Sequence, residues 1–178
     1  MAISIATNNY RNNYYIPVGY KFHPTEEELI DLYLVRKNRG QRLPCDTVKE
    51  YDLYGMEEPW EIWNKFEGGR VSVDDQEVFF FTKLKSKNTS KIRIDRRVAS
   101  GTWKGESNAQ ILRVRDHKTC IGLKSKFKYI NDKSEQNSKW LMHEYSLKKK
   151  AAQEDPGEYV LCRLIKNCPE RKKKNWRM

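Results

Sequence analysis

The 178-residue sequence contains 38% hydrophobic and 12% aromatic residues, a composition typical of one folded domain and not of a disordered chain. No apolar run approaches the ~18 residues that a membrane span needs, and Met1–Asn13 lacks the charged start and apolar block of a signal peptide. The four cysteines show no C-x-x-C pair and therefore indicate reduced intracellular thiols: Cys45, Cys120, Cys162 and Cys168.

The net charge of +11 is unevenly placed along the chain. Residues 1–80 carry 9 basic and 14 acidic side chains, a balance of −5, whereas residues 81–178 carry 26 and 10, a balance of +16. A strongly basic second half favours a partner that carries phosphate. Nucleic acid is the first expectation, and an anionic membrane surface is the second.

The first expected element is a helix that follows an Asn- and Tyr-rich tail (residues 1–15) and an extended lead-in. Thr25 is a helix N-cap residue, and Glu28 three positions later completes a capping box. Gly40 follows the last turn and is expected to end the helix. Four residues at helical spacing are expected to share one face: Leu29, Leu32, Tyr33 and Arg36.

The middle of the chain carries shorter signals. Val48–Tyr54 is typical of a strand or a short helix, and Glu58–Trp63 of a helical turn with Pro59 at its first position. The apolar run Glu77–Leu84 has strand length. Lys85–Ile92 is predicted to be a basic loop, because it combines three lysines with Ser, Asn and Thr.

The most informative stretch is Arg96–Ser107, R-R-V-A-S-G-T-W-K-G-E-S. It predicts a short strand, Thr102–Lys104, that is entered and left at glycines. Alternation buries Trp103 and turns Lys104 outward, beside Arg96 and Arg97. A basic edge backed by a buried aromatic residue is suited to contact with a polyanion. An ordinary surface strand with a core tryptophan remains the alternative.

Two further segments are predicted as strands on either side of a turn at Asp116–Lys118: Gln110–Arg115 and Cys120–Tyr129. The second alternates strictly, with an apolar face opposite three lysines, Lys124, Lys126 and Lys128. Such a face either contacts phosphate or protects an edge strand from aggregation, and the nearby basic loop favours phosphate.

Two more strands are expected at Lys139–Leu147 and Glu158–Lys166, before a basic tail. Because the strands follow one another without crossover helices, the sequence predicts one strongly twisted antiparallel sheet, with the helices of the first half at its side. The predicted fold class is α+β.

Seven regions carry a family resemblance in family order: V-G-Y-K-F-H-P-T-E-E-E-L (18–29), Y-D-L-Y (51–54) with E-P-W (58–60), V-F-F-F (78–81), S-G-T-W-K (100–104), I-G-L-K (121–124), W-L-M-H-E-Y-S-L (140–147) and Y-V-L-C-R-L-I-K (159–166). Together they resemble the plant NAC-domain transcription factors. The resemblance covers residues 16–167 and leaves 1–15 and 168–178 as tails.

The resemblance implies a nuclear dimer, formed with itself or with related NAC proteins, that binds double-stranded DNA and inserts the W-K strand edge into the major groove. Arg97 and Lys104 match family positions directly, whereas Gly105 and Glu106 depart from the usual W-K-A-T-G. The implied DNA-binding set is Arg93, Arg96, Arg97, Thr102, Lys104, Gly105, Glu106, Lys124, Lys126, Lys128 and Lys133. The implied dimer interface comprises Val18, Tyr20, Lys21, Phe22 and Glu28, in which Lys21 and Glu28 match an Arg–Glu pair across the dimer.

A second interpretation is a module that pairs with active relatives but binds DNA poorly. Two features support this interpretation. Glu106 is acidic, and a short basic end stands in place of the regulatory C-terminal region usual in the family. An enzyme is not expected, because no nucleophile or carboxylate pair accompanies the three histidines. Neither a cofactor nor a metal is expected, since His117 and Cys120 have no second ligand pair at metal spacing.

Overall fold

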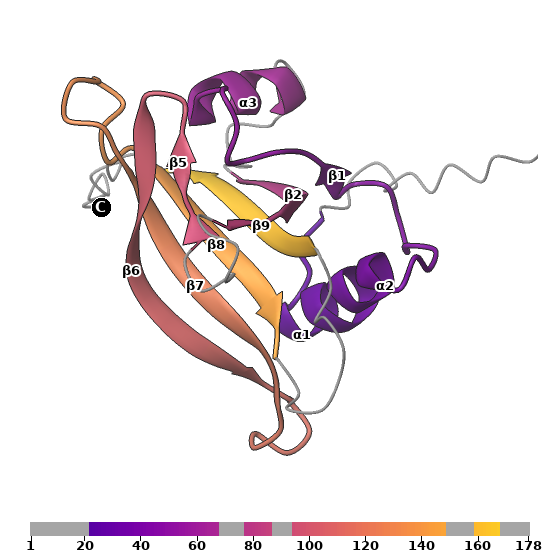
Figure 1. The fold of residues 1–178 in the computed structure, drawn as a ribbon. Coiled ribbons are helices and arrows are strands. Elements are labelled where there is room, and N and C mark those ends of the chain that lie inside the picture. The colour runs from indigo at the N-terminus through magenta and orange to yellow at the C-terminus, as the bar shows by residue number, and fades with distance from the viewer. Residues whose placement is uncertain (1–21, 68–76, 87–93, 149–158, 168–178) are drawn as a thin grey trace, which may run out of the picture.

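The computed structural model describes residues 22–67, 77–86, 94–148 and 159–167 (Figure 1). Seven strands form one sheet in the order β1-β2-β9-β8-β7-β6-β5. Their bounds are β1 Lys49–Glu50, β2 Glu77–Lys83, β5 Arg97–Val98, β6 Gly101–Leu112, β7 Cys120–Ile130, β8 Trp140–Leu147 and β9 Tyr159–Lys166. The pair β1–β2 is parallel and every other pair is antiparallel, so the predicted α+β class is confirmed with a mixed sheet. Two short strands, β3 (Lys85–Ser86) and β4 (Ile94–Asp95), pair separately.

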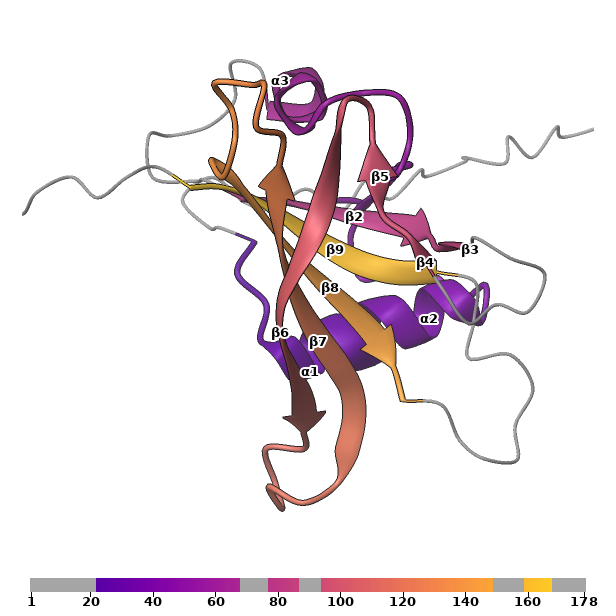
Figure 2. The same cartoon turned by 60° about the vertical axis from the view of Figure 1, so that its left-hand side comes forward.

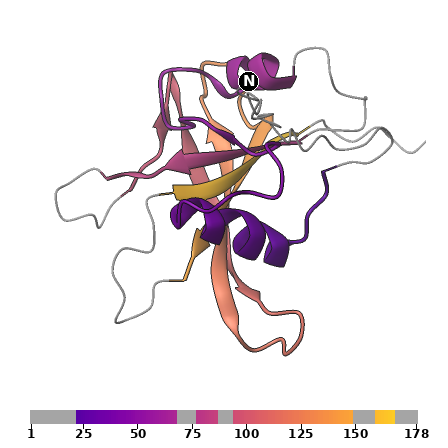
Figure 3. The same cartoon turned by 90° about the vertical axis from the view of Figure 1, so that its right-hand side faces the viewer.

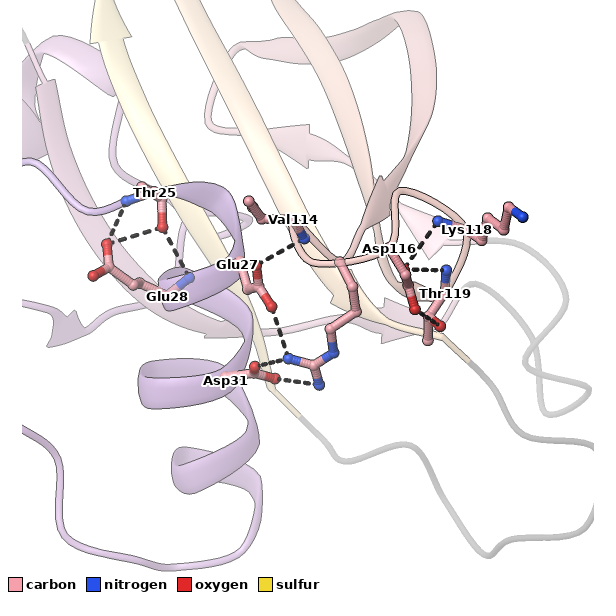
Figure 4. Close-up of polar contacts among 9 residues, drawn as sticks. Thr25, Glu27, Glu28, Asp31, Val114, Asp116, Lys118 and Thr119 are labelled. Atoms are coloured by element: carbon pink, nitrogen blue, oxygen red, sulfur yellow. Dashed lines mark hydrogen bonds and ion pairs between the residues drawn. The ribbon is translucent and has the colours of Figure 1, made fainter.

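The first helix has three consecutive parts: α1 (Glu26–Glu28), the π-helical segment η1 (Leu29–Leu34) and α2 (Val35–Asn38). Its predicted capping box is confirmed, because Glu28 N donates to Thr25 Oγ1 over 3.2 Å and Thr25 N donates to Glu28 Oε2 over 2.8 Å (Figure 4). After the helix, Gly40 has φ +64°, a left-handed conformation that favours glycine. The predicted face is wrong at Leu32, which is 37% exposed; the buried side chains are Leu29, Ile30, Tyr33 and Leu34.

The second helix, α3 (Pro59–Glu67), begins at the proline as predicted. In the described ranges, no helix is sufficiently long and apolar to cross a membrane.

The part of the sheet around β2 is covered on both faces, which explains the unbroken apolar run of that strand. The α1–α2 helix crosses one face, hereafter the helix face, and α3 lies at the end of the sheet near β5 (Figures 2 and 3). Phe79 and Phe81 belong to the core under the α1–α2 helix, whereas Val78 and Phe80 belong to the core on the opposite face, hereafter the α3 face. Because successive strand residues point to opposite faces, a strand buried on both sides reads as continuous V-F-F-F.

The long hairpin β6–β7 extends well beyond the rest of the sheet (Figure 1). The prediction that the W-K strand ends at Gly105 is wrong, because β6 continues to Leu112 through a β-bulge between Gly105 and Ser107. The bulge resets the alternation, so that Lys104 and the core residue Ile111 lie on the same face although they are seven residues apart. The separate strand predicted at Gln110–Arg115 is likewise wrong, because its first half belongs to β6 and its second half lies outside the sheet.

The far end of this hairpin is tied to the first helix. Arg113 pairs with Asp31 and with Glu27, whose other carboxylate oxygen accepts the Val114 amide hydrogen over 3.0 Å (Figure 4). The hydrogen bond from Val114, followed by that from Arg113, lowers the pKa of Glu27. The predicted turn beyond is confirmed, and the Asp116 side chain accepts hydrogen bonds from residues within it. These contacts explain how a hairpin that projects from the sheet is oriented.

Candidate nucleic-acid interface

The start of β6 presents its side chains as the sequence predicts. Trp103 is 4% exposed and packs edge-to-face against Tyr129, with ring centroids 5.8 Å apart. Thr102 and Lys104 are exposed on the opposite face. The edge strand β5 pairs with Gly101 and Thr102 of β6 but does not reach Lys104. From Lys104 onward, β6 is therefore itself the edge strand of the sheet.

Lys104 lies directly opposite Lys128 in the β6–β7 register. Like charges in directly opposite positions destabilise a strand pair. The bulge places Glu106 beside them, with its carboxylate 2.5 Å from the Lys128 ammonium. Glu106 therefore neutralises one lysine of the pair, while Lys104 forms no ion pair in the described part of the chain.

Arg97, on β5, lies directly opposite Thr102 and is exposed, with 76% of its side chain accessible. Asp95 holds its guanidinium through bonds to Nε and to Nη2, the latter 2.7 Å long. A planar guanidinium held in this way is oriented before a ligand arrives, which lowers the entropy lost on contact with phosphate.

Arg96 does not lie beside Lys104 as the sequence suggested, because its side chain reaches the α3 face. Its guanidinium lies 4.5 Å from the centroid of the Phe127 ring and 3.0 Å from the Glu144 carboxylate, which also accepts a short hydrogen bond from Tyr54. Glu144 is 4% exposed, so this pair is largely removed from water. The geometry gives Arg96 a structural role beneath the strand, and its guanidinium is turned away from the exposed face that carries Lys104.

The three lysines of β7 share one face as predicted, but they differ in availability. Lys124 is bound to Glu26 under the first helix, and Lys128 to Glu106. Lys126 is exposed and forms no ion pair within the described residues. It lies opposite His143, whose pKa is lowered to about 4 by burial and then by Lys124, Arg163 and Lys126, so the imidazole is neutral at pH 7.

The other predicted contact residues lie in the β7–β8 loop, in the N-terminal segment or outside the described ranges. Lys133 is exposed in the loop between β7 and β8. Four residues lie outside the described ranges: Val18, Tyr20, Lys21 and Arg93. Phe22 packs within its own chain, with ring centroids 5.0 Å from Phe79 and 5.4 Å from Tyr33, and Glu28 is occupied in the capping box.

Among the described residues, no group of three His, Cys, Asp or Glu side chains is arranged to hold a metal. The Cys120 thiol, considered with His117 as a ligand pair, donates to the Gly122 carbonyl over 3.4 Å.

Sequence reasoning missed two buried glutamates, Glu58 and Glu144, which are 9% and 4% exposed. Both lie beneath the β5–β6 region, where they accept hydrogen bonds from residues distant in sequence. Glutamate normally lies at the surface, so the only signal in the sequence was its place within the motifs E-P-W and W-L-M-H-E-Y.

Residues 17–147 match the family model described as No apical meristem (NAM) protein. The chain belongs to this NAM, or NAC-domain, family. It is 33% identical over 156 residues to NAC domain-containing protein 54 of Oryza sativa subsp. japonica, a match that covers 85% of this chain and 23% of the relative. It is 34% identical over 157 residues to NAC domain-containing protein 86 of Arabidopsis thaliana, covering 85% and 32%.

A third relative, NAC domain-containing protein 68 of Oryza sativa subsp. japonica, is 34% identical over 172 residues, covering 90% of this chain and 50% of the relative. The chain thus spans between about a quarter and a half of the length of these plant relatives. Membership of the family is consistent with a role in transcription regulation.

Proposed function

We propose that this chain is the DNA-binding and dimerisation domain, over residues 16–167, of a transcription factor that acts in the nucleus and is not an enzyme. One observation carries the proposal. Arg97 and Lys104 are both exposed at one end of the sheet, on the strand edge that the buried Trp103 supports. Lys126, Lys128 and Lys133 come from the neighbouring β7 and the loop that follows it.

In this proposal the edge of β6 enters the major groove. The major groove, roughly 12 Å wide, admits a two-stranded β-ribbon, and β6 is paired with β7 in such a ribbon beyond the end of β5. Lys104 then reaches base edges, Arg97 binds phosphate, and the exposed Lys126 and Lys133 follow the DNA backbone. Phosphate contacts position the protein and base contacts specify the sequence. Family membership supports this assignment.

The proposal predicts steep salt dependence of binding to duplex DNA. A protein that neutralises about 6–10 phosphates loses about 10³–10⁵ in affinity between 50 and 200 mM salt. Loss of Lys104 in Lys104→Ala should cost about 1–3 kcal/mol on a selected duplex and relax specificity. Loss of Arg97 in Arg97→Ala should weaken selected and scrambled duplexes equally.

These effects are measured by fluorescence anisotropy on duplexes chosen from a random library. Lys118→Ala is the matched control, because Lys118 is an exposed lysine in the turn at the opposite end of the same hairpin. A flat salt profile would refute the proposal. Undiminished binding by both site variants would remove the groove-strand assignment.

A module that pairs with active relatives but binds DNA poorly remains the second candidate, and the Glu106–Lys128 ion pair favours it because it lowers the local positive charge. Two results together would support that candidate: this chain binds a labelled NAC-domain relative, and it shows no salt-dependent binding to duplex DNA.

A further inference from the structure

A buried carboxylate lies at the junction between α3 and the β5–β6 turn. Glu58 precedes Pro59, and its carbonyl accepts the amide hydrogens of Glu61 and Ile62 over 3.0 and 3.1 Å. Its own amide donates to the Glu61 carboxylate over 2.8 Å. These bonds fix the Glu58 backbone at the beginning of a helix, so its side chain projects from a rigid support.

Three donors converge on this carboxylate from parts of the chain that are 42 and 71 residues away. Glu58 Oε1 accepts the Ser100 amide hydrogen over 3.1 Å and a short hydrogen bond from the Ser100 hydroxyl. Glu58 Oε2 accepts from the Tyr129 hydroxyl over 2.7 Å. Asn131 completes the network by donating to the Ser100 and Tyr129 oxygens over 2.7 and 3.2 Å.

Tyr129 is suited to this position because it stays protonated. Burial, as the largest cause, raises the pKa of its hydroxyl, which therefore remains a donor at neutral pH. Its ring also supports the two tryptophans Trp60 and Trp103 at centroid distances of 5.8 Å.

The turn held by Glu58 is fixed from other directions as well. A Cβ atom on Gly101 would lie 2.5 Å from the Tyr129 ring, so only glycine allows this close approach. Ala99 has φ +42° and donates its amide hydrogen to the Gly55 carbonyl over 3.0 Å. The turn leads directly into Thr102–Lys104, so a shift of the turn displaces the residues that face the groove.

The hydrogen-bond network around Glu58 is poorly explained by a contribution to the stability of the fold. In the described residues Glu58 has no cationic partner, and a buried carboxylate held only by neutral donors is expensive to desolvate. A group of this kind is better suited to selecting one geometry than to increasing the free energy of unfolding.

We propose that Glu58 is a positioning residue, which acts through Ser100 and Tyr129 to fix the β5–β6 turn so that Lys104 meets DNA bases in one register. The inference rests on the proposed function, because it assigns Glu58 a part in sequence preference.

The test compares Glu58→Gln and Ser100→Ala with the unaltered 178-residue chain on a selected duplex and on a scrambled duplex. Glutamine keeps the size of the side chain but only one acceptor oxygen, so one of the two hydroxyls loses its acceptor, meets an NH2 donor and must rotate away from its present geometry. Loss of one buried hydrogen bond should lower the population of the fixed turn by about tenfold, and affinity for the selected duplex should fall in the same proportion. Binding to the scrambled duplex and the salt slope should not change.

Glu57→Gln is the matched control. Glu57 adjoins Glu58, but its carboxylate accepts from Tyr51 and from Lys65, and not from Ser100 or Tyr129. This variant should keep the ratio of selected to scrambled affinity.

A second readout needs no DNA. Amide hydrogen exchange of Ser100 and of Thr102–Lys104 should accelerate in Glu58→Gln and not in Glu57→Gln. An unchanged affinity ratio despite faster exchange, or an equal loss on both duplexes, would overturn the positioning role. If the unaltered chain binds neither duplex, the proposed function is refuted, and the exchange rates still decide whether Glu58 fixes this strand.

Discussion

Glu106 is the departure from the usual W-K-A-T-G pattern with the clearest physical consequence. Its carboxylate binds Lys128 and lies next to Lys104, where two lysines face each other across the strand pair. The neighbouring departure, Gly105, has little effect on packing, because an added Cβ would lie 3.7 Å from the Phe127 ring, an ordinary contact. Glu106 thus reduces repulsion in the free protein and opposes the approach of phosphate.

We predict that Glu106→Thr strengthens binding to duplex DNA, because it removes a negative charge and releases Lys128. If Lys128 then contacts one phosphate, the slope of log affinity against log salt should steepen by about 0.9. The same change in a Lys128→Met background should produce no steepening, which makes the double variant the control. Weaker binding by Glu106→Thr would instead indicate that Glu106 accepts a hydrogen bond from a cytosine amino group.

Among the elements, the first helix shows how local bonds prepare a long-range contact. Each of the three glutamates of its first turn has a separate partner: Glu26 binds Lys124, Glu27 binds Arg113, and Glu28 closes the capping box. The first two tie the helix to β7 and to the end of the β6–β7 hairpin. The third satisfies the Thr25 amide hydrogen that the helix itself leaves unpaired.

The capping box gives a stability prediction. Thr25→Ala removes the oxygen that accepts the Glu28 amide hydrogen and should lower the free energy of unfolding by about 1 kcal/mol. Thr25→Ser retains that oxygen and should lose less than half as much. Urea unfolding followed by circular dichroism measures both. Equal losses in the two variants would show that the methyl group of Thr25, and not its hydroxyl, is responsible.

For the molecule as a whole, the family resemblance predicts a two-fold dimer in which Lys21 of one chain meets Glu28 of the other. Lysine lacks the bidentate geometry of the arginine usual in the family, and exposed ion pairs contribute only about 0–1 kcal/mol. Apolar neighbours such as Val18 and Tyr20 should therefore supply most of the association. Glu28 also accepts two hydrogen bonds from Thr25, so its replacement disturbs the helix as well as the pair.

The dimer prediction is tested by charge exchange. Lys21→Glu and Glu28→Lys should each weaken dimerisation in sedimentation experiments, and the double variant should partly restore it. Glu28→Gln is the control, because it removes the charge but keeps an acceptor for Thr25. A monomeric unaltered chain at micromolar concentration, or no recovery in the double variant, would refute the pairing.

The features that the sequence determined are those set by neighbouring residues. Alternation along a strand is enough to bury Trp103 and expose Lys104, and a cap three residues from its partner is enough to begin a helix at Thr25. The antiparallel order from β6 to β9 followed from short connections. These rules depend on backbone geometry and on side chains within a few positions, so a single sequence is sufficient to apply them.

Only the tertiary structure decided which charged residues are available to a partner. Arg96, Arg97 and Lys104 look alike in the sequence, but Glu144, 48 residues from Arg96, draws that arginine beneath the strand. The bulge at Glu106 joined two predicted strands into one, because Gly105 and the partner strand β7 allow an extra residue where sequence patterns indicate an end. Burial of a charge depends on what surrounds it in space, and at Glu58 and Glu144 those surroundings come from distant parts of the chain.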